Sequence, residues 1–193
     1  MKLETECSTS DAINIIMNYA KIKHYDPANG EGIRISLFVS GCNFHCHGCF
    51  NPETQDFDYG QPFTDDTMHE IISLVENEHI DGLSILGGDP LCQDVNDLVK
   101  LTNLVCSIKK MNKNVWIWSG FTWEQIFPKV TADELDTLSI HRQMLIEACD
   151  IWVDGQFIES KKDLRLQWRG SSNQRVIDIQ NTLKQGQIVL YQN

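Results

Sequence analysis

The sequence predicts an α/β fold with a mainly parallel sheet, arranged as a partial, open (β/α) barrel. Short apolar stretches alternate with longer segments of helical periodicity, a pattern typical of βαβ units. Eight such units of ~30 residues each need more than the 193 residues of this chain, so a partial barrel fits better than a closed one. We expect one domain over residues 17–193, preceded by an N-terminal extension over residues 1–16.

The order of the elements follows from the apolar pattern. Three longer segments carry apolar residues at helical spacing and predict helices over residues 65–78, 95–110 and 133–149. Thr64, followed by Asp65 and Asp66, predicts the N-cap of the first helix. Six shorter apolar stretches predict strands over residues 33–39, 83–86, 115–118, 151–153, 176–179 and 188–191.

Most of these strands end at glycine, serine or aspartate. Functional loops of parallel α/β folds lie at the carboxyl ends of the strands, which share one edge of the sheet. Four loops are therefore expected to surround one site: a cysteine-rich loop over residues 41–50, Gly87-Gly88-Asp89, Ser119-Gly120 and Asp154-Gly155.

Composition narrows the classes of function. Sixteen basic and 27 acidic residues give a net charge of −11, which argues against nucleic acid as the main ligand. No apolar run approaches the ~20 residues of a membrane span, and the acidic N-terminus does not read as a signal peptide. Of the seven cysteines, Cys7, Cys92, Cys106 and Cys149 are scattered and are expected to be small buried hydrophobes. The absence of a paired cysteine framework indicates a reducing cytoplasm.

Cys42, Cys46 and Cys49 form a Cys-x3-Cys-x2-Cys loop directly after the first predicted strand. Three thiolates are one short of the four that fill a structural zinc site or an iron–sulfur cluster, which leaves one metal position open. Gly48 lets the backbone approach a bound group closely. His45 and His47 keep zinc as an alternative, although structural zinc sites usually draw on two separated ligand pairs and no second pair is evident.

The other three loops offer functional groups that ordinary turns also use. Asp89 follows a glycine pair and can pair with an ammonium group or cap the following helix. Ser119 and Asp154 can hydrogen-bond ribose hydroxyls or a cation, or serve turn chemistry. Arg34 points either to the site or to the polar side of its strand. Trp116, Trp118 and Trp152 are expected in the core.

The cysteine loop and the Gly87-Gly88-Asp89 motif resemble the radical S-adenosylmethionine superfamily, in which a glutamate takes the place of Asp89. The resemblance implies a 4Fe–4S cluster on Cys42, Cys46 and Cys49 whose open iron binds S-adenosylmethionine. Reductive cleavage then gives a 5′-deoxyadenosyl radical that abstracts a hydrogen atom from the substrate. The backbone of Gly48, Cys49 and Phe50 and of Gly87, Gly88 and Asp89 would hold the methionine end. No catalytic side chain beyond the cluster and cofactor is expected.

Further motifs resemble one branch, the activating enzymes of the anaerobic (class III) ribonucleotide reductase. They lie at residues 30–34, 37–42, 47–51, 60–64, 87–91, 116–120, 153–157 and 168–174. This resemblance implies a glycyl radical placed on the reductase large subunit, with an electron donor such as flavodoxin. Polar residues of the last motif would contact the adenosyl group or the docked partner: Arg169, Ser171, Asn173 and Gln174. The alternatives are an activase of another glycyl-radical enzyme and a non-catalytic iron–sulfur carrier or zinc module.

Overall fold

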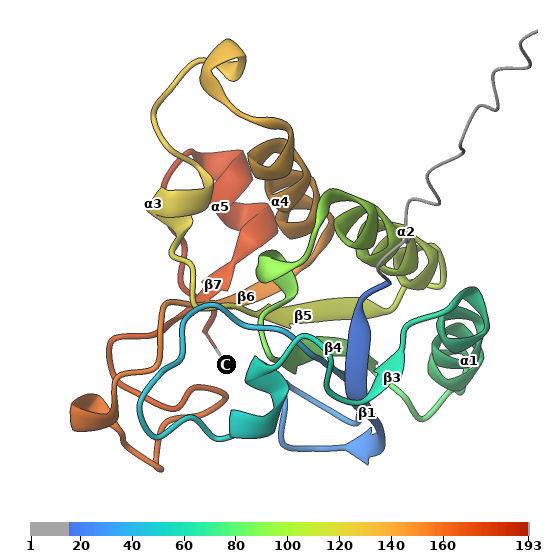
Figure 1. Ribbon diagram of the computed structural model, residues 1–193. Helices are drawn as coiled ribbons and strands as arrows, with labels where there is room; N and C mark the ends of the chain where they lie inside the picture. The colour runs from blue at the N-terminus through green and yellow to red at the C-terminus, as the bar shows by residue number, and fades with distance from the viewer. Residues whose placement is uncertain (1–15, 193) are drawn as a thin grey trace, which may run out of the picture.

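One seven-stranded sheet organises residues 16–192, the part of the chain that this computed structural model describes (Figure 1). Its spatial order is β3-β1-β2-β4-β5-β6-β7. The predicted N-terminal extension lies outside the described residues except for Ile16. The strands are β1 (Asn18–Asp26), β2 (Arg34–Val39), β3 (Gln61–Pro62), β4 (Gly82–Gly87), β5 (Asn114–Trp118), β6 (Ile151–Asp154) and β7 (Arg175–Asp178).

The middle of the sheet is parallel. Strands β2, β4, β5 and β6 run side by side in the same direction, with Val39 opposite Gly87 at the carboxyl ends of β2 and β4. Antiparallel strands β1 and β3 lie beyond β2, and antiparallel β7 lies beyond β6. Each successive parallel strand adds on the same side of the previous one, which is the winding of a (β/α) barrel. The mixed α/β fold is confirmed, whereas its curvature into a partial barrel stays a prediction.

Helices cover one face of this sheet (Figure 1). They are α1 (Asp65–Val75), α2 (Val95–Lys110), α3 (Trp123–Ile126), α4 (Thr137–Ala148) and α5 (Ile179–Gln185). The hydroxyl of Thr64 caps α1, as predicted, by accepting from Thr67 N, and Asp94 caps α2 in the same way. Apolar side chains of α1, α2 and α4 pack with those of the strands in one core that includes Ile71, Leu101, Leu145, Leu37 and Ile117. None of the helices among residues 16–192 is both apolar enough and long enough to cross a bilayer.

Tryptophan side chains cover the opposite face. Along β5, Val115 and Ile117 point to the helix side, while Trp116 and Trp118 point to the other. The Trp168 ring lies 4.8 Å from that of Trp116, and the Trp118 indole donates to the Trp168 carbonyl at 2.7 Å. Trp116 is buried in this second cluster, as expected from the sequence, and Trp118 is partly buried.

Three sequence expectations differ from the structure. Strand β1 is not predicted because its sequence, Asn-Tyr-Ala-Lys-Ile-Lys-His-Tyr-Asp, is mostly polar, and Asp26 is its one buried residue. The predicted strand over residues 188–191 is wrong: the segment makes one isolated bridge, Ile177 with Leu190, after α5 ends at the left-handed Gly186. The third predicted helix begins late, at Thr137, because Asp136 supplies its N-cap.

Arg34 is buried at the amino ends of the parallel strands. Its guanidinium donates to Ser84 Oγ and Leu83 O in β4, both at 2.7 Å, and to Asn114 Oδ1 in β5 at 2.7 Å. Burial lowers the pKa of Arg34 to about 10, which leaves it charged at neutral pH. Arg34 therefore ties strands together at the edge opposite the cysteine loop, and faces neither the site nor solvent.

Asp26 provides a test of stability against pH. Its buried carboxylate accepts from Lys23 Nζ at 2.8 Å and Ala28 N at 3.0 Å. Burial raises its pKa, but these hydrogen bonds outweigh it and lower the pKa of Asp26 to about 2. Because the folded pKa lies below the unfolded value, the stabilisation is present above about pH 4 and is lost as the pH falls towards about 2.

We expect the wild type to lose about 2 kcal/mol of unfolding free energy relative to Asp26→Asn across this pH window, measured by urea unfolding. Asp133→Asn, at an exposed side chain, is the matched control, and parallel wild-type and Asp26→Asn profiles would contradict the expectation.

Candidate active site

The cysteine loop leaves the carboxyl end of β2 and returns through a short 3-10 helix, η1 (Pro52–Gln55). Gly41 N donates to Thr54 O at 2.8 Å and Cys42 N donates to Gln55 O at 3.1 Å, so η1 closes the loop at its base. Asn51 N donates to Cys49 Sγ at 3.4 Å. Cys42, Cys46 and Cys49 are all half-buried free thiols, accessible enough to receive a metal group.

The structure brings the four predicted loops to one edge of the sheet. Gly88 N donates to Val39 O at 2.7 Å and Asp89 N donates to Gly41 O at 2.8 Å, which joins the second loop to the cysteine loop. Ser119 N donates to Val153 O at 3.1 Å and Gly155 N donates to Phe121 O at 2.8 Å, which joins the last two loops. The strand pattern therefore predicted this shared edge correctly.

Glycine is required where the first two loops meet. Gly87 has φ of +109°, in the region that favours glycine, and a Cβ there would lie 2.7 Å from Val39 O. A Cβ on Gly88 would lie 2.6 Å from both Gly41 O and Thr54 O. Backbone atoms on both sides leave no flexible group to yield, so the pair sets how closely the two loops approach.

We therefore expect Gly88→Ala to push the base of the cysteine loop away from β4. The unfolding free energy should fall by about 1–3 kcal/mol, the usual cost of overpacking, and iron bound after anaerobic reconstitution should fall with it. Gly186→Ala is the control for iron binding: its Cβ would meet nothing within 4 Å and it lies at the end of α5, so it should lose some stability through its left-handed backbone but keep full iron binding. Full iron binding and unchanged stability in Gly88→Ala would contradict this account.

Cys92, which the sequence suggested was a buried hydrophobe, lies half-buried beside Cys42 in η2 (Pro90–Cys92). The sulfurs of Cys42 and Cys92 and a carboxylate oxygen of Asp89 all lie within 4.8 Å of one another. A hydrogen bond from the Cys92 thiol lowers the pKa of Cys42 to about 7, and the same bond raises the pKa of Cys92. The one sequence feature that could have indicated that Cys92 lies near the site is its position three residues after Asp89.

The other cysteines differ in their surroundings. Burial raises the pKa of Cys46. Cys149 is fully buried, as expected, whereas Cys106 is exposed on α2, which contradicts its expected burial. Cys7 lies outside the described residues.

The carboxylate of Asp89 is turned into the protein. Oδ1 accepts from Leu91 N at 2.8 Å, which caps η2, and Oδ2 accepts from Gly120 N at 2.7 Å. Ser119 Oγ donates to both oxygens, at 2.9 and 3.0 Å, and accepts from Phe121 N. Burial raises the pKa of Asp89 to about 6. Capping and loop-joining are thus observed for Asp89, and its contact with an ammonium group stays a prediction.

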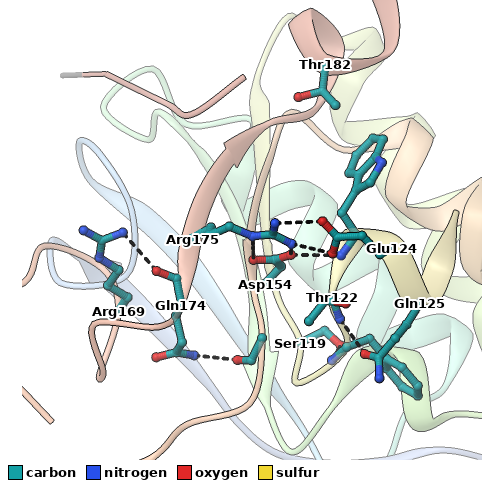
Figure 2. A network of polar contacts seen from close by, with 12 residues as sticks. Ser119, Thr122, Glu124, Gln125, Asp154, Arg169, Gln174, Arg175 and Thr182 are labelled. Atoms are coloured by element: carbon teal, nitrogen blue, oxygen red, sulfur yellow. Dashed lines mark hydrogen bonds and ion pairs between the residues drawn. The ribbon is translucent and has the colours of Figure 1, made fainter. Parts of the chain in front are cut away.

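Asp154 is held by a residue that sequence reasoning missed, Arg175 at the start of β7 (Figure 2). Arg175 Nε donates to Asp154 Oδ1 at 2.9 Å, and Nη2 forms an ion pair with Oδ2. The guanidinium also donates to the Glu124 carboxylate, from Nη1 to Oε1 and from Nη2 to Oε2, both at 2.9 Å. The pKa of Glu124 falls to about 2 through these bonds, and that of Arg175 rises, chiefly through Asp154. Sequence placed Arg175 only as the residue after the 168–174 motif.

Gln174 organises that motif and ties it to the carboxyl end of β6. Its Oε1 accepts from Gly170 N at 2.9 Å. Its Nε2 donates to Gly155 O at 2.9 Å (Figure 2). Arg169 donates to the carbonyl of Gln174 and Asn173 to that of Gln156. Ser171 Oγ accepts from Ile158 N. These contacts give the motif a structural role, and contact with a cofactor or partner stays a prediction.

A pocket of about 410 Å³ opens beside the cysteine loop, within the size range of small-molecule sites. Of the predicted site residues, Asp154 lines it. It is built from the cysteine loop and the segments after β5 and β6, together with the start of β7. Its lining consists of Phe44, Gly120, Thr122, Glu124, Gln125, Asp154, Gly155, Gln156, Ile158, Asn173 and Arg175.

The histidines and Phe50 of the cysteine loop have partners of their own. His45 Nδ1 lies 3.2 Å from Gln55 Oε1, and His47 pairs with Glu159, whose carboxylate also lies against Gly48. Phe50 is half exposed, with its ring 5.2 Å from that of Phe157. Within residues 16–192, the close group of ligand-type side chains consists of Cys42, Asp89 and Cys92; it includes neither histidine, and Cys46 and Cys49 lie outside it.

Fold and site together define an α/β protein with a cysteine-rich loop at the carboxyl edge of its parallel strands, and comparison with known proteins shows which kind of domain this is. Residues 28–177 match the family model described as "4Fe-4S single cluster domain". The chain is 37% identical over 163 residues to the anaerobic ribonucleoside-triphosphate reductase-activating protein of Escherichia coli (strain K12), covering 83% of this chain and 97% of that protein.

Similar proteins occur beyond that species. The protein of the same name from enterobacteria phage T4 is 35% identical over 162 residues, covering 83% of this chain and 93% of the relative. The Vibrio cholerae protein is 35% identical over 164 residues, covering 82% and 96%. The chain belongs to the family of anaerobic ribonucleoside-triphosphate reductase-activating proteins, which confirms the predicted family.

Proposed function

We propose that this protein is an enzyme that activates the anaerobic ribonucleoside-triphosphate reductase by generating a glycyl radical on its large subunit. The observation that carries this proposal is the junction of the cysteine loop with Gly88 and Asp89, at the carboxyl edge of the parallel strands. The names of the relatives supply the target. The pocket offers room for a small molecule between Phe44 of the cysteine loop and Asp154 at the end of β6.

Cys42, Cys46 and Cys49 would hold one 4Fe–4S cluster. The donor set fits, because all three thiols are half-buried on one anchored loop and a backbone N–H already points at Cys49 Sγ. Thiolates of a cluster bind different irons, so they stand further apart than the ligands of a single ion. When bound, the cluster supplies one electron for the reductive cleavage of S-adenosylmethionine at its iron without a protein ligand.

The rest of the site would position S-adenosylmethionine. We assign the methionine end to the backbone of Gly48, Cys49 and Phe50 and of Gly87, Gly88 and Asp89. Asp154 lines the pocket and is the candidate partner for the ribose hydroxyls or a cation. Ser119 would position Asp89 rather than contact the cofactor directly, because its hydroxyl donates a hydrogen bond to the Asp89 carboxylate. No general base is needed, since hydrogen-atom abstraction moves no isolated proton.

The partner and setting complete the proposal. A sheet curved into a partial, open barrel would leave the carboxyl edge accessible to a loop of the reductase. A low-potential donor such as flavodoxin would supply the electron, and free thiols suit a reducing cytoplasm. The net charge of −11 supports a protein partner over nucleic acid.

The test is anaerobic reconstitution with iron and sulfide, followed by reduction with S-adenosylmethionine and the purified reductase. We expect about four irons and four sulfides per chain, release of methionine and 5′-deoxyadenosine, and a glycyl-radical signal in the reductase by electron paramagnetic resonance. Intact S-adenosylmethionine after full cluster reduction would overturn the proposal. Cleavage without a radical on the reductase would point to another glycyl-radical enzyme, and one zinc without sulfide would point to a structural module.

A further inference from the structure

The Cys92 thiol has no part in the proposed three-cysteine ligand set, yet it lies against one member of that set. Its sulfur and that of Cys42 are within 4.8 Å of each other, and both side chains are half-buried. The two residues are 50 positions apart, so the fold, rather than the loop, makes this pair. Two free thiols at such a distance form a candidate disulfide.

The backbone keeps the two segments together. Asp89 N donates to Gly41 O at 2.8 Å, next to Cys42. The buried Gln93, next to Cys92, donates through Nε2 to Ser40 O and Asp89 O, both at 3.0 Å. A disulfide brings its sulfurs to about 2.05 Å, and side-chain rotation in two neighbouring segments can supply that approach without unfolding either one.

We propose that Cys42 and Cys92 form a disulfide when the cluster is absent, which removes one cluster ligand reversibly. A small-molecule disulfide is the oxidant. The Cys42 thiolate attacks one of its sulfurs and releases a first small thiolate, giving a mixed disulfide. The Cys92 thiolate then attacks Cys42 Sγ and releases a second small thiolate. Two protein thiols lose two electrons and two protons, and one small disulfide becomes two small thiols.

The consequence for cluster loading rests on the proposed function. A bridged Cys42 has no thiolate to offer iron, so the oxidised protein cannot complete a three-cysteine site. A disulfide is also protected from the further oxidation that turns thiolates into sulfinic and sulfonic acids, whereas thiol reductants restore it. The pair would therefore store the apo-protein in a recoverable form after exposure to oxidants.

The experiment uses the full-length apo-protein, fully reduced and then treated with oxidised glutathione without air. Free thiols are alkylated, and the digest is mapped by mass spectrometry. We expect a Cys42–Cys92 linked peptide and an intact mass lower by two hydrogen atoms. Cys106→Ser, which removes an exposed thiol on α2, should give the same link. Cys92→Ser should leave Cys42 as a glutathione adduct, because the thiol that lies against Cys42 and would displace the glutathione is gone.

Three results would overturn the inference: a link from Cys42 to Cys46 or Cys49, a glutathione adduct that persists on Cys42 in the wild type, or a link between two chains. As a second measurement, the oxidised wild type should bind little iron on reconstitution and recover after dithiothreitol. Thiol mapping requires neither cluster nor S-adenosylmethionine. A missing link thus leaves the proposed function standing, and failed cluster assembly in the reduced protein leaves the link standing.

Discussion

Replacing Cys46 with alanine is expected to abolish the cluster and to reduce activation of the reductase by more than about 100-fold. Loss of a group that only supports a metal ligand already costs about 10–100-fold, and a direct ligand should cost more. Cys46 is the informative choice because Cys42 has a second neighbour in Cys92, which would complicate its replacement. Iron and sulfide content, and the electron paramagnetic resonance signal of the reduced protein, measure the effect directly.

The matched control is Cys106→Ala, which removes an exposed thiol on α2. It should keep full iron content and full activity. The urea midpoint of the apo-proteins should be similar for both variants, since Cys46 lies half-buried in a loop and outside the two apolar clusters. Wild-type iron content in Cys46→Ala would mean that another group ligates the cluster.

The second large effect is expected from Arg175→Met, which should lower the unfolding free energy by about 3 kcal/mol. Asp154 is 1% exposed, and the substitution would leave its carboxylate buried without a cation. Breaking a buried pair from one side costs about 3–5 kcal/mol, and the lower end applies because water reaches part of the Arg175 guanidinium. Urea unfolding of the apo-protein gives the measurement.

A double variant separates charge burial from lost packing. Arg175→Met with Asp154→Asn removes both charges and should recover most of the loss, while Glu124→Gln should cost less than about 1 kcal/mol at its more exposed position. Equal stability of the single Arg175→Met variant and the double variant would rule out the buried carboxylate as the cause.

The sequence was sufficient to predict the parallel part of the sheet, because its strands are buried on both faces and read as short apolar runs. Strand β1 was not predicted because it is only partly buried and irregularly paired with β2, and its polar residues resemble a loop. The prediction of a strand over residues 188–191 was wrong for the opposite reason, because this segment is apolar but is not a strand. Tyr191 packs against the tryptophan cluster, but Leu190 is exposed and makes a single bridge with Ile177 in place of a ladder.

In the site, too, features that depend on residue type and spacing were predicted, and features that depend on tertiary neighbours were not. Its thiols and glycines follow from residue type and spacing, because few other residues could do the same work at a strand end. The direction of the Asp89 carboxylate does not follow, since Ser119 and Gly120 reach it from 30 positions away. Cys92 and Arg175 are likewise defined by tertiary neighbours, which a local pattern does not contain.

The Arg34 contacts have a consequence for how this protein can diverge in evolution. They fix the register of β2, β4 and β5 relative to one another at the amino ends of these strands. The loops that carry the thiols and the pocket sit at the far ends of the same strands. Mutations that reshape those loops for a different partner can therefore accumulate without shifting the strands, whereas the sequence around Arg34 has little such freedom.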